Sequence, residues 1–239
     1  MDPLTHTKRT RKTSMPVKIL ELQDWEARIR QRLDSLTSPT TANIRGVRRE
    51  FSQQLKTMPA DFVVRLALHL LKHKQHIPRF LAYELVQHHA RAARSLNSGK
   101  LKSLGEGIDS WGAVDTFACY LAGPAWREGQ VSDSLIASWA HSRDRWWRRT
   151  AVVSTVALNN KARGGIGDVD RTLRICQLVV ADRDPMVVKA LSWALRELSK
   201  RNSAAVKKFV LENQPALPPL VVREVNNKLK TGLKNPRSR

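Results

Sequence analysis

The chain of 239 residues lacks the features that mark several common classes of protein. It has only two cysteines, Cys119 and Cys176, without the spacing of a zinc site or a secreted disulfide framework. We interpret both as reduced thiols in the core. No apolar run approaches the roughly 18 residues of a membrane span, and the N-terminus lacks the apolar block of a signal peptide. We therefore expect a cytoplasmic protein with no membrane partner.

Acidic residues are scarce as well. The chain has 21 Asp and Glu against 42 Lys and Arg, which gives a formal net charge of +21 and a pI near 10.9. Such an excess favours a polyanionic partner, because each phosphate that is neutralised releases condensed counterions. Composition does not separate DNA from RNA, and a ribosome-associated or merely basic protein is an alternative.

Strand patterns are absent too, and what is present indicates helices. Apolar residues recur at spacings of three and four, interrupted by helix-breaking stretches such as "SPTTAN", "AGPA" and "NNKARGGIGD". We predict an all-α protein with a single domain over residues 16–231. Residues 1–15 are predicted to be a disordered basic arm, and residues 232–239 a flexible basic tail.

The main internal signal is a repeat of about 40 residues. The stretch "SRDRWWRRTAVVSTVAL" aligns with "DRDPMVVKALSWALREL", so that the Arg-Asp pair at 143–144 matches the pair at 183–184. Two helices in a unit of this length are typical of HEAT-like repeats, which stack into an α-solenoid. Such solenoids bind long partners along a concave face, which we predict to be basic here.

Helix geometry predicts which basic side chains point together. Arg145 and Arg149 share a face, and Lys189 is the repeat equivalent of Arg149. Trp193 follows Lys189 by one turn. Arg149, Lys189 and Trp193 should therefore look out from one surface of two neighbouring repeats. The alternatives are a core position for the tryptophan and a salt-bridged or solvated position for the arginine.

An aspartate also stands in the apolar stretch "DSWGAVDTFACYLAG". Asp115 lies one helical turn after Trp111 and loses hydration that a partner must restore. A neighbouring arginine or a backbone amide is the common solution, and a catalytic role is the alternative.

Three segments, "SWGAVD", "WWRRTAV" and "VVKALSWALRELSKRNSAAVKKFV", carry a family resemblance in this order. From about Asn43 to about Lys230 the chain resembles the AlkD-like DNA glycosylases, the HEAT-like-repeat enzymes of the DNA alkylation repair family. The resemblance implies a monofunctional hydrolase of base excision repair, associated with the nucleoid when bound to DNA. The resemblance further implies that the substrates are cationic alkylpurines, such as N3-methyladenine and N7-methylguanine, in double-stranded DNA.

The resemblance also implies roles for individual residues. Asp115 corresponds to the catalytic carboxylate of the family, and Trp111 and Trp193 correspond to two aromatics that flank the deoxyribose of the lesion. Arg149 corresponds to a phosphate-contacting arginine. Gly112 stands where the family often has a polar residue, which adds backbone freedom beside Trp111. With Arg149 we assign three further basic residues to DNA binding: Arg145, Arg148 and Lys189.

Other kinds of chemistry find little support in the sequence. No lysine lies within the proposed Trp and Asp constellation, so we expect hydrolysis without a lyase step. The histidines have no matching acidic or cysteine cluster, and "RGGIG" at 163–167 is not preceded by a strand. We expect no metal, no cofactor and a monomer. The alternative function is a non-catalytic HEAT-like nucleic-acid-binding protein, and a more distant one is a protein-interaction scaffold.

Overall fold

The computed structural model describes residues 15–72 and 78–236, and in these ranges the chain is helical without any strand. The predicted all-α fold is confirmed. Residues 1–14 of the predicted arm lie outside the described residues. The elements are α1 (Met15–Asp34), α2 (Thr41–Gln54), α3 (Ala60–Lys72), α4 (Arg79–Gln87), α5 (Ala90–Arg94), α6 (Ser98–Gly105), α7 (Trp111–Phe117), the π-helix η1 (Ala118–Ala122), α8 (Gly123–Arg127), α9 (Asp133–Ala140), α10 (Arg145–Asn159), the 3₁₀-helix η2 (Lys161–Arg163), α11 (Val169–Leu178), α12 (Pro185–Leu198), α13 (Ser203–Asn213) and α14 (Pro219–Thr231).

The two aligned repeat units begin their second helices in the same way. Asp144 accepts a hydrogen bond from the backbone N–H of Trp146 at the start of α10, and Asp184 accepts one from Met186 at the start of α12, both at 2.8 Å. Such a cap satisfies an N–H that has no partner within the helix and is worth about 1 kcal/mol. The Arg-Asp repeat in the sequence therefore marks two equivalent helix starts.

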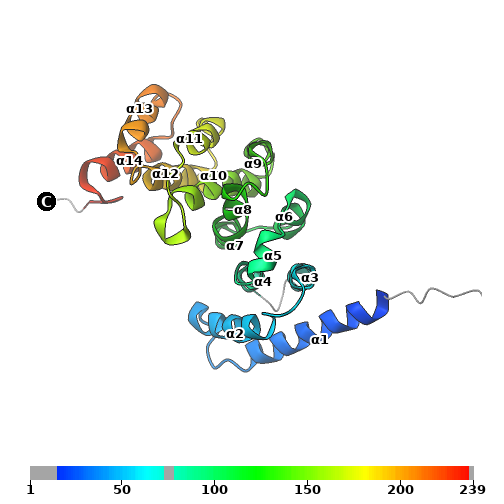
Figure 1. Ribbon diagram of the computed structural model, residues 1–239. Coiled ribbons are helices and arrows are strands. Elements are labelled where there is room, and N and C mark those ends of the chain that lie inside the picture. Colours follow the sequence, from blue (N-terminus) through cyan, green and yellow to red (C-terminus); the bar gives the residue numbers. More distant parts are fainter. Residues whose placement is uncertain (1–14, 73–77, 237–239) are drawn as a thin grey trace, which may run out of the picture.

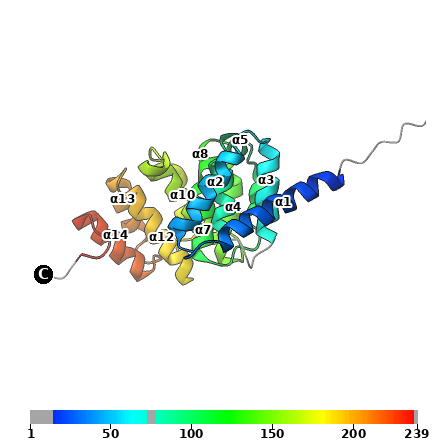
Figure 2. The same cartoon turned by 90° about the horizontal axis from the view of Figure 1, so that it is seen from below.

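The helices form an α-solenoid in which one row runs the length of the molecule (Figure 1). We call α2, α4, α7, α10, α12 and α14 the central row, because each of them packs against the next. Helices α1, α3, α9, α11 and α13 pack against this row, and the view from below shows α1 and α14 at opposite ends (Figure 2). No helix within the described ranges is long and apolar enough to cross a membrane.

The core follows the helical periodicity of the sequence. For α12, helical spacing in the sequence predicts a core stripe of six residues, and all six are buried: Val187, Ala190, Leu191, Ala194, Leu195 and Leu198. Cys119 and Cys176 are buried thiols, and burial raises the pKa of each to about 12, which keeps them protonated.

At the crossing of α8 and α10, a Cβ on Gly123 would lie 2.6 Å from the Cβ of Ala157, so only glycine fits.

Candidate active site

The helix that carries Asp115 continues into a π turn. Gly123 donates its backbone N–H to the carbonyl of Ala118, five residues earlier, so that α7, η1 and α8 run on as one helix. Pro124 has no N–H to offer the carbonyl of Tyr120, and a widened turn accommodates this loss. The break that we predicted at "AGPA" is therefore wrong. Single π turns recur at functional sites, and this one begins three residues after Asp115.

Asp115 forms an ion pair with Arg149 that joins two helices of the central row. Nε and Nη2 of Arg149 donate to Oδ1 of Asp115 at 3.0 and 2.9 Å, and Nη2 also donates to Oδ2 at 3.0 Å. Nη1 of Arg149 donates to the carbonyl of Met186. One guanidinium thus ties α10 to α7 and to the first turn of α12.

The burial of Arg149 differs from the sequence prediction. The residue is only 5% exposed, so the prediction that it looks out from the surface is wrong. It is buried because α7 and α12 pack on both sides of α10 and offer a carboxylate and a carbonyl. The neighbouring arginine that we expected as a partner of Asp115 is confirmed. The assignment of Arg149 to DNA binding stays a prediction.

The Asp115 carboxylate keeps one open side. Its side chain is 22% exposed, and Oδ2 accepts a single hydrogen bond from Arg149, which leaves further acceptor capacity. Loss of hydration raises the pKa of Asp115 above its usual value of 3.8, while the charge and hydrogen bonds of Arg149 oppose the rise. The positive charge of Arg163 acts on this pKa in the same direction as Arg149.

The two predicted tryptophans lie on the helices that Arg149 connects. Trp111 begins α7, one turn before Asp115, and is 63% exposed. Trp193 is partly exposed and packs against the core, which confirms the exposure that we predicted for it. It follows Met186 by two turns on the same face of α12. The hydrogen bond from Arg149 to Met186 therefore fixes the helix that carries Trp193 relative to Asp115.

The other predicted DNA-binding residues differ in how they are used. Arg148 pairs with Asp182 at 2.7 Å and also donates to backbone carbonyls, so it supports the fold. Arg145 is 52% exposed and lies 3.6 Å from Asp184. Lys189 is exposed and has no ion-pair partner among the residues that the structure describes. Arg145 and Lys189 are thus the members of this set that solvent can reach most easily.

One residue near the site was not predicted from the sequence. The guanidinium of Arg163 lies 4.7 Å from the ring centroid of Tyr120, which belongs to the π turn after Asp115. Its position just before the glycines of "RGGIG" was the only signal, and the sequence does not show that the loop folds towards Tyr120.

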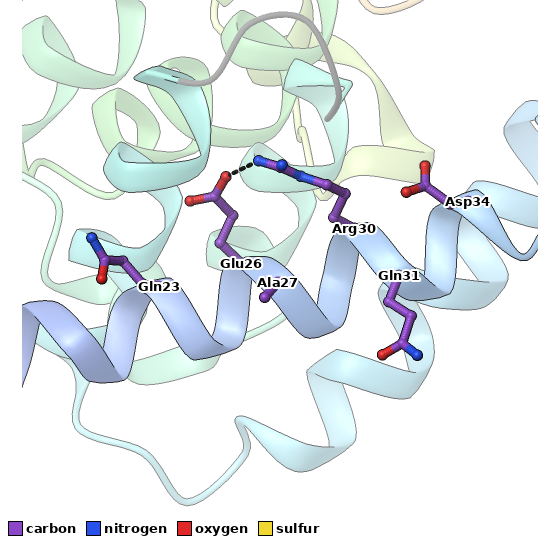
Figure 3. A pocket seen from close by; sticks show the side chains of 6 residues that line it. All are labelled: Gln23, Glu26, Ala27, Arg30, Gln31 and Asp34. Atoms are coloured by element: carbon purple, nitrogen blue, oxygen red, sulfur yellow. Dashed lines mark hydrogen bonds and ion pairs between the residues drawn. The ribbon is translucent and has the colours of Figure 1, made fainter.

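A separate groove of about 520 Å³ lies along α1 (Figure 3). Glu26 faces this groove and pairs with Arg30 of the same helix and with His69 of α3, the latter at 2.6 Å. All of its lining residues belong to α1: Gln23, Glu26, Ala27, Arg30, Gln31 and Asp34. It shares no residue with the Asp115 site. Within the described ranges, no group of three or more His, Cys, Asp or Glu could hold a metal ion.

Comparison with known proteins places this site within a family. The family model described as DNA alkylation repair enzyme matches residues 34–229, from the end of α1 into α14. No curated protein matches the chain significantly. The matched region includes Asp115, Arg149 and both tryptophans, and it spans well over half of the sequence. The chain therefore belongs to the DNA alkylation repair enzyme family.

Proposed function

We propose that this protein is a monofunctional DNA glycosylase that hydrolyses the N-glycosidic bond of cationic alkylated purines in duplex DNA. The observation that carries the proposal is a partly exposed carboxylate, Asp115, held by the buried Arg149 between two tryptophan-bearing helices. N3-methyladenine and N7-methylguanine are the substrates that suit it, and membership of the family supports a role in alkylation repair.

The chemistry requires little help for the leaving base. An alkylpurine that carries a positive charge leaves as a neutral base, so no proton donor is needed. The sugar then becomes an oxocarbenium-like cation, which a nearby carboxylate stabilises while it orients the attacking water. Oδ2 of Asp115 has the acceptor capacity for this role. Arg149 is a positioning residue, since Nε and Nη2 of its planar guanidinium both donate to the carboxylate and fix its orientation.

The aromatic residues contribute through their ring faces. Indole rings carry negative quadrupole density on their faces, which attracts a developing cation and packs against the apolar side of the sugar. Trp111 is exposed enough to meet DNA, and Trp193 presents a partly exposed ring. Arg145 and Lys189 are then the exposed cations that meet phosphates, without need of a metal or cofactor.

Base release from a defined duplex tests this function. Purified protein is incubated with duplex DNA that holds one N7-methylguanine, and free base and abasic sites are measured. We expect both products in equal amounts, without strand cleavage. Asp115→Asn keeps the shape of the side chain but removes its charge, so release should fall about 100-fold or more while DNA affinity stays level or rises.

The alternative function predicts a different result. A non-catalytic nucleic-acid-binding protein of this fold would bind the same duplex without releasing any base. Wild-type protein that binds but does not release N7-methylguanine or N3-methyladenine would establish that alternative. Near-normal base release by Asp115→Asn would instead mean that the protein is a glycosylase in which Asp115 is not catalytic.

A further inference from the structure

The loop after α10, residues 160–167, is held by the repeat that precedes it. Arg127 of α8 donates from Nη1 to the carbonyl of Ala157 at 3.1 Å and to the carbonyl of Arg163 at 2.7 Å. Gly164 follows with φ of +80°, a conformation that favours glycine, and a Cβ there would meet the Arg127 guanidinium at 3.4 Å. The backbone of Arg163 is therefore fixed against α8.

The same loop is also held by the repeat that follows it. Arg201, just after α12, donates from Nε to the carbonyl of Asn159 at 2.8 Å and from Nη2 to the carbonyl of Gly165 at 2.7 Å. A Cβ on Gly165 would lie 2.7 Å from the carbonyl oxygen of Ala157, so the loop folds tightly onto the last turn of α10. A surface loop held from both sides presents its side chains at little further entropic cost.

The side chain of Arg163 contrasts with its fixed backbone. Its guanidinium stacks over Tyr120 at 4.7 Å and makes no hydrogen bond or ion pair with any residue that the structure describes. Nη1 is buried without a partner, whereas Nε and Nη2 are not shielded in this way. A duplex cannot reach the buried Nη1, so the Nε and Nη2 edge is the part of this guanidinium that is open to a ligand. The natural ligand of a planar guanidinium is an oxyanion, which it binds through two parallel hydrogen bonds.

The position of Arg163 indicates which oxyanion this is. Arg163 stacks on Tyr120, which belongs to the π turn that follows Asp115, and its positive charge opposes the rise in the pKa of Asp115. An uncompensated cation there would oppose the positive charge that forms on the sugar. A phosphate on Arg163 would neutralise it and leave the carboxylate to act on the sugar.

We propose that Arg163 binds a phosphate of the DNA strand beside the nucleotide at Asp115, and that it provides the backbone contact for which the donors of Arg149 are already occupied. This inference rests on the proposed function, because it assumes that duplex DNA lies over Asp115. It assigns the two arginines different roles: Arg149 positions the carboxylate, and Arg163 positions the strand.

Binding to a duplex that cannot be cleaved tests the inference. The probe is a duplex with a tetrahydrofuran abasic analogue, and its affinity is measured at several salt concentrations. Arg163→Ala should weaken binding about tenfold and reduce the magnitude of the salt slope by about one unit. Arg174→Ala is the matched control, because Arg174 lies on α11 with its side chain 60% exposed. It should change neither quantity.

A neutral phosphate locates the contact. One methylphosphonate is placed either directly 5′ or directly 3′ of the abasic analogue, and the binding of wild type and Arg163→Ala is compared on each duplex. On one of the two duplexes the affinity difference between the proteins should disappear. A difference that persists on both, or an unchanged affinity and salt slope on the unmodified duplex, would overturn the proposal.

Two controls keep the result interpretable. The side chain of Arg163 makes no hydrogen bond with described residues, so Arg163→Ala should fold, which a thermal melt checks. Arg163→Lys keeps the charge and loses the fork, and should bind with intermediate affinity. These duplexes hold no base to release, so the binding result is independent of catalysis. Absence of base release by the wild type in the glycosylase assay would refute the proposed function. Unchanged DNA binding by Arg163→Ala would refute only this inference.

Discussion

Two arginines, one near each end of α10, influence the Asp115 carboxylate, but among the described residues the hydrogen-bond donors of one are occupied and those of the other are not. Near the N-terminal end, Arg149 is buried and donates to Asp115 and to the carbonyl of Met186. Beyond the C-terminal end, Arg163 stacks on Tyr120 and has no hydrogen-bond partner in the described chain. On the proposed function, the occupancy of its donors therefore predicts better than its charge whether an arginine contacts DNA.

The same distinction applies to the net charge of +21. Many arginines of this chain support the fold by donating to backbone carbonyls. These include Arg91, Arg127, Arg148, Arg171 and Arg201. The net charge therefore overstates the number of cations whose donors are free to bind a partner.

The largest expected effect is on the stability contributed by the occupied arginine. Arg149→Ala leaves a partly buried carboxylate without its partner and should lower the free energy of unfolding by about 3 kcal/mol. Denaturant unfolding measures the loss. Adding Asp115→Asn to this variant should recover part of it, because a neutral amide needs no cation. A loss no larger than that of Arg163→Ala would show that the two ends of α10 do not differ.

The tryptophans extend the comparison to aromatic residues. Trp193 packs against the core and is partly exposed, so Trp193→Ala should cost about 2 kcal/mol, less than the 3–5 kcal/mol of a fully buried tryptophan. Trp111 is mostly exposed, and Trp111→Ala should cost only about 0.5 kcal/mol. Both variants should reduce base release by about tenfold or more per folded molecule. Thermal melts paired with single-turnover excision separate the effect on stability from the effect on base release. Unchanged excision by Trp193→Ala would mean that this residue only packs against the core.

The pH dependence of excision tests how Arg149 acts on Asp115. Burial raises the pKa of Asp115, so the rate should rise with pH through that raised pKa and stay level above it, as the carboxylate ionises. The folded state binds this proton more tightly than the unfolded chain, so the Asp115 contribution to stability is greatest at low pH and is lost as pH rises through the folded pKa. Arg149→Gln removes the main opposing influence and should move the acid limb to higher pH. An acid limb at the same pH in both proteins would contradict the positioning role.

The smallest expected effect is that of Arg163→Ala on stability. This change removes a stacking contact with Tyr120 but no hydrogen bond within the described chain. The free energy of unfolding should therefore fall by about 0.5 kcal/mol or less. The same denaturant titration as for Arg149→Ala measures it. A loss above about 2 kcal/mol would mean that Arg163 supports the fold like the other arginine.

What the sequence predicted correctly depends on local periodicity. The core stripe of α12 follows from helical spacing alone, and the aligned Arg-Asp pairs mark equivalent positions at two helix starts. The burial of Arg149 did not follow, because it depends on partners from α7 and α12 that are distant in sequence. The approach of Arg163 to Tyr120 depends likewise on a loop conformation that two distant arginines hold in place.

One measurement tests the central claim most directly: the maximal single-turnover rate of N7-methylguanine release at saturating protein, for wild type, Arg163→Ala and Arg149→Lys. Arg163→Ala should keep the maximal rate within about twofold and need about ten times more protein to reach it. Arg149→Lys loses the fork that holds Asp115 and should lower the maximal rate about tenfold or more at any protein concentration. A maximal rate that is lost in Arg163→Ala and retained in Arg149→Lys would contradict the division of roles between the two ends of α10.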